Sequence, residues 1–175
     1  MAETTTQTRE PGTGIGEWLK GKYLTFLLGN EEYGLEILKV HQIIQMQEVT
    51  RVPRTPGYVR GVINLRGRVI PVIDLRIKFG MEGVDDTEKS CIIVVQIEHE
   101  GHAVTMGVII DEVREVLEIP ADAIEETPSF GDDVDTGFIM GMGKVGDKVK
   151  MLLDIDKVLS ATELQSLATL AKEKG

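Results

Sequence analysis

The chain has 175 residues, 42% of them hydrophobic and 27% charged, so it is long enough to bury a core of its own. Its 29 acidic and 19 basic side chains give a formal charge of −10, which disfavours nucleic acid as a partner because acidic side chains repel phosphates. No apolar run reaches the roughly 20 residues of a membrane span, and the polar N-terminus has no signal-peptide core, so we expect neither membrane insertion nor export.

Residues 1–20 are polar and include five threonines before residue 14, so we expect a disordered N-terminal tail. The next segment, "YLTFLL", reads as a strand that ends at the turn "GNEE". "YGLEILKVHQIIQM" begins extended, and its middle (38–44) fits a helical turn or a strand. After the proline-containing loop "RVPRTPGYV", the strands "GVINL" and "VIPVIDL" are joined by a tight turn in which Gly67 allows a positive φ. Pro71 predicts that the second of these strands lies at an edge or contains a bulge.

The second half of the chain repeats this order of elements. It offers the strands "CIIVVQI", "HAVTMGVII", "DEVREVLEI", "GFIMGMG" and "KVKMLLDI". The stretch "VIPVIDLRIKF" aligns without gaps on "VKMLLDIDKVL" at an offset of 80, with Asp74 on Asp154. The matching order predicts an internal duplication, in which these two aspartates cap the segments that follow their strands. Ser160 and Glu163 form a capping box at the start of an amphipathic helix.

These elements predict a mostly β fold of two pseudo-repeated five-stranded barrels packed together, with short helices and a C-terminal helix. We expect one domain over residues 21–160, followed by the helix at 161–175. Its subdomains would span about 21–83 and 84–160, and strands at the boundary could be exchanged between them.

No group of residues indicates catalysis, a cofactor or a metal. The G-x-G-x-x-G run at 141–146 leads into a strand instead of a helix, so it predicts a hairpin and not a dinucleotide site. The histidines of the turn at 99–102 lack further zinc ligands, and the acidic loop at 132–137 lacks the spacing of a calcium loop. Cys91 lies in an apolar strand and reads as a buried thiol. We therefore expect a protein that is not an enzyme.

Charge is distributed unevenly along the chain. Residues 51–80 carry six arginines and a lysine against one aspartate, a net +6, whereas residues 98–135 carry twelve acids against one arginine, a net −11. Arg60, Arg66 and Arg68 lie on or beside one hairpin turn. Because arginine pairs bidentately with carboxylates and is enriched at interfaces, this turn suggests a protein-binding site. A solvated hairpin end is the alternative for each of the three.

Three stretches, "EEYGLEILKVHQI", "TPGYVRGVINLRGRVIPVIDLRIKFG" and "VIIDEVREVLEI", resemble the CheW-like family of bacterial chemotaxis coupling proteins. The resemblance covers most of residues 21–160 and ends with "MLLDIDKVL". It implies two five-stranded SH3-like barrels packed around a shared hydrophobic seam. It also implies a non-catalytic adaptor that couples the cytoplasmic tips of chemoreceptors to the regulatory domain of the histidine kinase CheA. Such an adaptor is a cytoplasmic monomer in isolation and assembles into arrays at the inner face of the membrane, where receptors control kinase autophosphorylation.

The same resemblance implies which residues bind proteins. Arg66 in "NLRG" matches the key arginine of the family, and Gln42 stands where relatives can carry glutamate, so an ion pair between them is not assumed. Phe130 matches an aromatic residue at a second contact, although Glu125 stands where a basic residue can occur. The complete set is Ile37, Val40, Gln42, Gly61, Asn64, Arg66 and Phe130.

Three other interpretations remain open. The chain could be the regulatory domain of a larger kinase, although its start methionine, polar tail and capped last helix favour a complete small protein. A small-molecule enzyme built on barrels would need a pocket of convergent titratable groups. An oligonucleotide-binding barrel would need stacking aromatic residues beside the arginines, where only Tyr58 is near.

Overall fold

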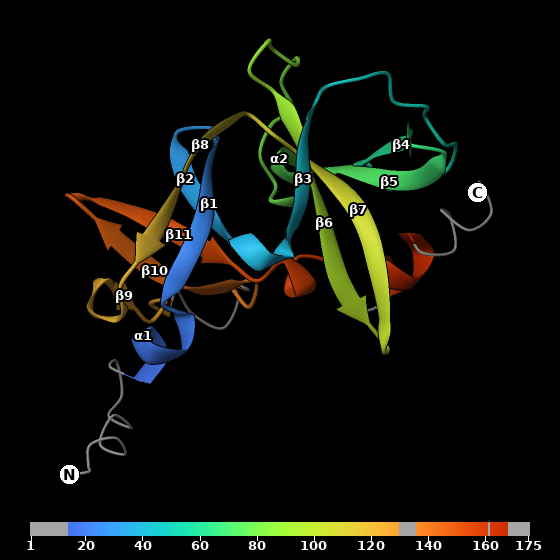
Figure 1. Cartoon of the computed structure of the whole chain (residues 1–175). Coiled ribbons are helices and arrows are strands. Elements are labelled where there is room, and N and C mark those ends of the chain that lie inside the picture. Colours follow the sequence, from blue (N-terminus) through green and yellow to red (C-terminus); the bar gives the residue numbers. More distant parts are fainter. Residues whose placement is uncertain (1–13, 130–135, 161, 168–175) are drawn as a thin grey trace.

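The computed structural model describes residues 14–129, 136–160 and 162–167. Phe130, most of the expected N-terminal tail and part of the expected C-terminal helix lie outside these residues. Figure 1 shows two lobes, each built on one sheet, with β1, β2, β8, β9, β10 and β11 in one lobe and β3 to β7 in the other. The fold is mostly β with short helical segments, as predicted.

The first lobe is a six-stranded sheet in the order β8-β1-β2-β11-β10-β9, which we call the six-stranded barrel. Its strands, in chain order, are β1 (Gly21–Leu28), β2 (Glu31–Glu36), β8 (Glu112–Ile119), β9 (Ile124–Glu125), β10 (Ile139–Val145) and β11 (Lys148–Leu153). The strands at its two ends, β8 and β9, are consecutive in the chain and are joined by a short 3-10 helix, η3 (Ala121–Ala123).

The second lobe is a five-stranded sheet in the order β3-β6-β7-β5-β4, which we call the five-stranded barrel. Its strands are β3 (Val40–Gln45), β4 (Val59–Leu65), β5 (Arg68–Asp74), β6 (Cys91–His99) and β7 (His102–Ile110). The short helices outside the sheets are α1 (Gly14–Leu19), η2 (Ile37–Lys39), α2 (Leu75–Lys78) and η4 (Ile155–Lys157). Residues 162–167 are also helical.

The two sheets share one plan. In each, an antiparallel hairpin (β1–β2 or β6–β7) pairs on one side with an antiparallel strand (β8 or β3). On its other side the hairpin pairs in parallel with β11 or β5, and that strand pairs with β10 or β4. The hairpin of each sheet comes from one half of the chain and the remaining strands from the other half. Each sheet therefore contains strands from both sides of residue 83, in a duplication whose halves exchange strands.

Local details repeat at the same offset of 80 residues. The backbone N–H of Asp74 donates to the carbonyl of Tyr58 at 2.7 Å, and that of Asp154 donates to the carbonyl of Phe138 at 2.8 Å. The Asp74 carboxylate accepts hydrogen bonds from two backbone N–H groups at the start of α2, and the Asp154 carboxylate accepts one at the start of η4. The capping role predicted for both aspartates is confirmed.

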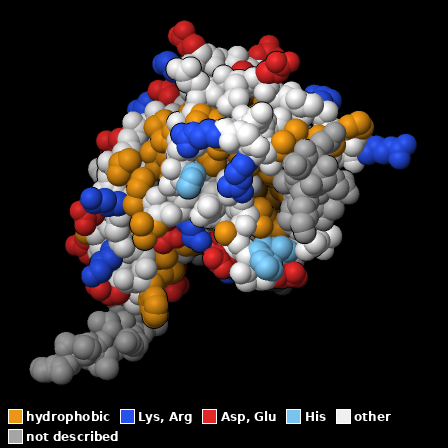
Figure 2. Space-filling model, turned by 45° about the vertical axis from the view of Figure 1, so that its right-hand side comes forward, with side chains coloured by type: hydrophobic (Ala, Val, Ile, Leu, Met, Phe, Trp, Pro, Cys, Tyr) orange, Lys and Arg blue, Asp and Glu red, His pale blue; other side chains and the backbone are white. Residues whose placement is uncertain are grey.

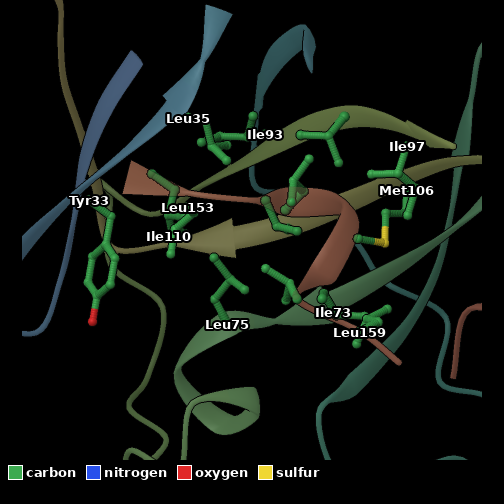
Figure 3. Close-up of a cluster of buried hydrophobic side chains, with 14 of the residues drawn as sticks. Tyr33, Leu35, Ile73, Leu75, Ile93, Ile97, Met106, Ile110, Leu153 and Leu159 are labelled. Carbon is green, nitrogen blue, oxygen red and sulfur yellow. The ribbon is translucent and has the colours of Figure 1, made fainter. Parts of the chain in front are cut away.

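The main hydrophobic core lies between the sheets and takes residues from both. In Figure 3, Leu35 lies beside Ile93 and Leu153 beside Ile110. Each barrel also has a smaller core of its own. Strand β6 contributes to two cores: Ile93 packs in the main core and Ile92 inside the five-stranded barrel. Burial on both faces explains why "CIIVVQI" is apolar without alternation.

Of the two alternatives predicted from Pro71, the edge is wrong, because β5 lies between β7 and β4. A bulge is present beside Pro71, since the pairing of β4 with β5 shifts register between Val59 and Gly61. Pro71 stands opposite Val62, whose backbone N–H and C=O exchange hydrogen bonds with Thr50 on its other side. The pairing of β5 with β7 begins only at Val72. Proline therefore removes no ladder hydrogen bond at this position, and an interior strand tolerates it.

Candidate protein-binding surface

The β4–β5 hairpin ends in a two-residue turn that presents Arg66. Arg66 and Gly67 have φ angles of 54° and 86°, as in a type I′ turn, whose twist matches that of the flanking strands. Asn64 supports the turn, because its Oδ1 accepts a hydrogen bond of 2.8 Å from the backbone N–H of Gly67. A left-handed conformation costs a non-glycine residue roughly 1–2 kcal/mol. An arginine kept in this conformation points to a role other than folding.

Arg66 contacts β3, which lies at the opposite edge of the five-stranded sheet. Its Nη2 donates a hydrogen bond of 3.1 Å to Oε1 of Gln42, so the curled sheet brings together two of the predicted site residues. Gln42 is neutral, and Arg66 is exposed, so its guanidinium keeps its charge for an external carboxylate. Nε2 of Gln42 is buried without a hydrogen-bond partner in the described part of the chain. This unmet donor costs stability and shows that the contact is not optimised for folding.

Gly61 supports the base of the same hairpin. It is buried with a φ of 147°, and a Cβ at this position would lie 2.1 Å from the carbonyl oxygen of Thr50. The close approach allows Thr50 and Val62 to exchange two backbone hydrogen bonds of 2.9 Å. Glycine is therefore required here so that the chain after β3 can close the barrel against β4.

The predicted apolar contacts Ile37 and Val40 flank the exposed Leu38. Ile37 and Val40 are partly buried and pack against the main core, so folding uses part of their apolar surface. Leu38 is 95% exposed, and Ile43, farther along on β3, is 44% exposed. Sequence reasoning missed Leu38 because the run "EILKV" spans a 3-10 turn, where neither helical nor strand periodicity separates buried from exposed positions.

An ion pair fixes η2 and thereby the position of Leu38. Nζ of Lys39 donates a hydrogen bond of 2.8 Å to Oδ2 of Asp156 in η4. This hydrogen bond raises the pKa of Lys39 above its ordinary value, although burial opposes it. The exposed leucine is thus held on an anchored turn and not on a free loop.

The other two arginines of the hairpin have different environments. Arg60 donates hydrogen bonds to Asp74 at 3.1 Å and Asp86 at 3.0 Å. Burial alone would lower the pKa of Arg60, but these hydrogen bonds outweigh it and raise the pKa. Arg68 is exposed, and its side chain makes no hydrogen bond or ion pair with any described residue. Arg60 therefore belongs to the fold, while Arg68 shares the exposed turn with Arg66.

Figure 2 shows Lys and Arg side chains and a histidine near the middle of one face, with hydrophobic side chains exposed around them. Many acidic side chains lie along the upper and left edges of this view. A surface that mixes exposed apolar groups with arginine is typical of protein interfaces.

Most of the acidic loop at 132–137 lies outside the described residues, and the other residues weighed for catalysis or metal binding lie in structural positions. The run at 141–146 forms β10 and its turn, which is the predicted hairpin. His99 and His102 face each other across the β6–β7 turn, and Nε2 of His99 lies 3.3 Å from Oε1 of Gln165. Cys91 is only partly buried, but burial still raises the pKa of its thiol and disfavours the reactive thiolate. Within the described ranges, no cluster of His, Cys, Asp and Glu could hold a metal, and no helix could span a membrane.

Comparison with known proteins identifies the family. Residues 22–163 match the family model described as the CheW-like domain. The chain belongs to this family. The chemotaxis protein CheW of Klebsiella aerogenes is 38% identical over 172 residues, which cover 98% of this chain and 99% of that protein. The probable chemotaxis protein CheW of Rhizobium etli is 31% identical over 143 residues, covering 82% and 90%.

A solved structure agrees with these CheW relatives. The crystal structure of the scaffolding protein TtCheW from Thermoanaerobacter tengcongensis matches with a TM-score of 0.73 and 35% sequence identity. The match covers 83% of this chain and 97% of that one. The family resemblance seen in the sequence is thereby confirmed, as is a mostly β fold of two packed sheets. One sheet has the five strands that the resemblance implies, and the other has six.

Proposed function

We propose that this chain is a non-catalytic chemotaxis adaptor that couples the cytoplasmic tips of chemoreceptors to the histidine kinase CheA. Membership of the CheW-like family supports this function, as do relatives named as chemotaxis proteins and a solved relative named as a scaffolding protein. In this function the chain works in the cytoplasm, at receptor arrays on the inner face of the membrane.

The observation that carries the proposal is the exposed, left-handed Arg66 at the tip of the β4–β5 hairpin. Its neutral partner Gln42 leaves its charge available to a carboxylate. Exposed Leu38 stands on η2, directly before the strand that carries Gln42. A guanidinium and an exposed leucine suit a helix whose apolar stripe is bordered by acidic residues.

The adaptor would act by binding and relay, without chemistry of its own. The protein-binding set in this proposal is Ile37, Val40, Gln42, Gly61, Asn64 and Arg66, with Phe130 at a second contact. Gly61 and Asn64 would act indirectly by shaping the turn, because Gly61 has no side chain to offer and Asn64 bonds to Gly67. Kinase autophosphorylation would come under receptor control because one rigid body binds both partners.

Substituting Arg66→Glu tests this assignment. We expect the affinity for a receptor signalling fragment or for the kinase to fall by about 2 kcal/mol or more, roughly 30-fold, because a carboxylate would face the partner's carboxylate. The measurement is co-sedimentation of the chain with both partners, together with kinase activation in the ternary mixture.

Lys89→Glu is the matched control, because it makes the same charge change on an exposed lysine in the loop between α2 and β6. Lys89→Glu should bind and activate as the parent chain does. Unchanged affinity of Arg66→Glu for both partners, with a native circular dichroism spectrum, would show that Arg66 is not a contact. Failure of the parent chain to bind either partner would reject the adaptor function itself.

A further inference from the structure

Two glycines, one in each barrel, identify positions inside the six-stranded barrel that are equivalent to positions inside the five-stranded barrel. A Cβ at Gly34 would lie 3.2 Å from Leu152, and a Cβ at Gly107 would lie 3.4 Å from Val72. Gly34 and Leu152 are directly paired between β2 and β11, as Gly107 and Val72 are between β7 and β5. These residues mark the same layer of each barrel.

The next layer differs between the barrels. Two residues before Val72, the five-stranded barrel has Ile70, which is buried in its apolar core. Two residues before Leu152, the six-stranded barrel has Lys150, which is 5% exposed and pairs with Glu32 directly opposite on β2. A buried ion pair has a desolvation cost that a second isoleucine would avoid, so stability does not explain it.

A β-bulge directs a second cation toward Glu32. Thr25 pairs with Glu115 and Phe26 with Val113, so Arg114 is the extra residue of β8. Bulges commonly redirect a side chain in this way. Nε of Arg114 lies 3.6 Å from Oε2 of Glu32, which is longer than the roughly 2.7–2.9 Å of a strong charge-assisted hydrogen bond. The guanidinium therefore has donor capacity to spare, since its contact with Oε2 of Glu112 is also long, at 3.4 Å.

Arg114 and Glu32 line a hollow of about 420 Å³ between β1, β2, β8 and β11, and the buried Lys150 lies beside it and outside the lining. The volume of the hollow is within the usual size range of small-molecule sites. Lys148 lines it and is exposed, and its side chain makes no hydrogen bond or ion pair with any described residue. Glu31 also lines it, and the Glu32 carboxylate is already shared by Lys150 and Arg114.

The hollow is less acidic than the molecule as a whole. Arg114 is the only Lys or Arg among residues 98–135, and β11 adds two lysines beside it. Its lining holds two cations, Arg114 and Lys148, and two carboxylates, Glu31 and Glu32, so the hollow is neutral, whereas the chain carries −10. A carboxylate therefore meets less repulsion in the hollow than over the acidic surface of the chain.

We propose that this hollow binds a carboxylate, either of a small organic acid or of an acidic residue in a partner's segment. Arg114 and Lys148 would donate to the bound carboxylate from opposite walls. The Lys150–Glu32 pair would form a fixed floor that keeps this end of the barrel polar. Equivalent binding in the five-stranded barrel is excluded, because Ile70 fills the position of Lys150.

The test is a backbone-amide NMR titration of the full chain with succinate and, separately, with a blocked Gly-Glu-Glu-Gly peptide. We expect saturable shifts at residues 27–32, 114 and 148–149, and a loss of affinity of about tenfold in Arg114→Gln or Lys148→Gln. Lys144→Gln is the matched control, since Lys144 is exposed on the same barrel but pairs with Glu125 at 2.7 Å and lies outside the lining. It should bind as the parent chain does.

The two probes separate the two sources of the carboxylate. Saturation by succinate supports a free acid, whereas saturation by the peptide alone supports a partner segment. Three results would overturn the proposal: no shift of these amides by either probe at millimolar concentration, equal binding of the uncharged succinamide, or equal weakening by Lys144→Gln and Lys148→Gln. Circular dichroism of each variant shows whether it is folded.

Discussion

At the scale of single residues, the arginines of the basic segment differ in what they contact. Arg60 and Arg76 have carboxylate partners, and Nη2 of Arg76 lies 2.7 Å from Oδ2 of Asp111. Arg66 contacts a neutral amide and stays exposed in a strained conformation. Part of the positive charge of residues 51–80 is therefore neutralised by ion pairs within the fold. The part that remains available lies at the hairpin tip.

Alanine substitutions at the neighbouring residues Ile37 and Leu38 can separate an effect on stability from an effect on receptor binding. Leu38→Ala should change the free energy of unfolding by less than about 0.5 kcal/mol, because the side chain is almost fully exposed. It should weaken binding of the receptor fragment by about 1–2 kcal/mol, because that contact would bury the leucine. Ile37→Ala should destabilise the fold by about 1–3 kcal/mol, since Ile37 packs against the main core.

Urea denaturation and receptor-fragment binding, measured on both variants, provide the comparison. The assignment of Leu38 as the exposed contact is wrong if Leu38→Ala binds as tightly as the parent chain. The packing argument for Ile37 is wrong if Ile37→Ala leaves the denaturation midpoint unchanged.

At the scale of elements, features with local causes could be predicted from the sequence. Gly67 indicated the tight turn, and Ser160 with Glu163 indicated a capping box, in which the backbone N–H of Ser160 donates to Oε1 of Glu163 at 2.8 Å. The Glu163 N–H donates in return to Oγ of Ser160 at 3.1 Å. The repeated order of strands indicated the duplication. Each of these signals depends on residues close together in the chain or on a repeat that can be aligned.

Features that depend on distant pairing could not be predicted in this way. The parallel pairing of β2 with β11 joins segments more than a hundred residues apart, and no local pattern encodes that choice. The hollow beside Arg114 follows from this pairing, because it brings Lys150 opposite Glu32. The Arg66 turn was predicted because its charge and its glycine are adjacent in the sequence, whereas its contact with Gln42 required the closed barrel.

The β4–β5 turn provides a prediction at the same scale. Arg66→Asn should raise the free energy of unfolding by about 0.5–1 kcal/mol, because Asn-Gly suits two successive positive φ angles better than Arg-Gly does. The same variant should bind the receptor fragment more weakly, since the guanidinium is lost. Urea denaturation and binding assays should therefore move in opposite directions. A variant that is less stable than the parent chain would show that the turn does not strain the arginine.

At the scale of the whole molecule, two ion pairs connect the halves of the chain at positions that the duplication makes equivalent. Their charges are reversed, because Arg76 in one pair corresponds to Asp156 in the other. Arg76, in α2 after β5, pairs with Asp111 at the end of β7. At the offset of 80, the position of Arg76 corresponds to Asp156, which pairs with Lys39 at the end of η2. Because the charges are reversed, a half that docked at the other of the two equivalent positions would bring like charges together. The exchange of strands is thus reinforced by charge as well as by the main core.

Strand exchange and a shared main core should make the two barrels unfold together. Leu152→Ala in the six-stranded barrel and Ile92→Ala in the five-stranded barrel remove buried side chains from separate small cores, at about 2–5 kcal/mol each. Native-state hydrogen exchange of the slowest amides in β1 and β6 reports the opening free energy of each barrel. Either substitution should lower both free energies by the same amount, with one urea transition. If Leu152→Ala lowers protection in β1 and leaves β6 unchanged, the barrels open independently and the exchanged strands do not couple them.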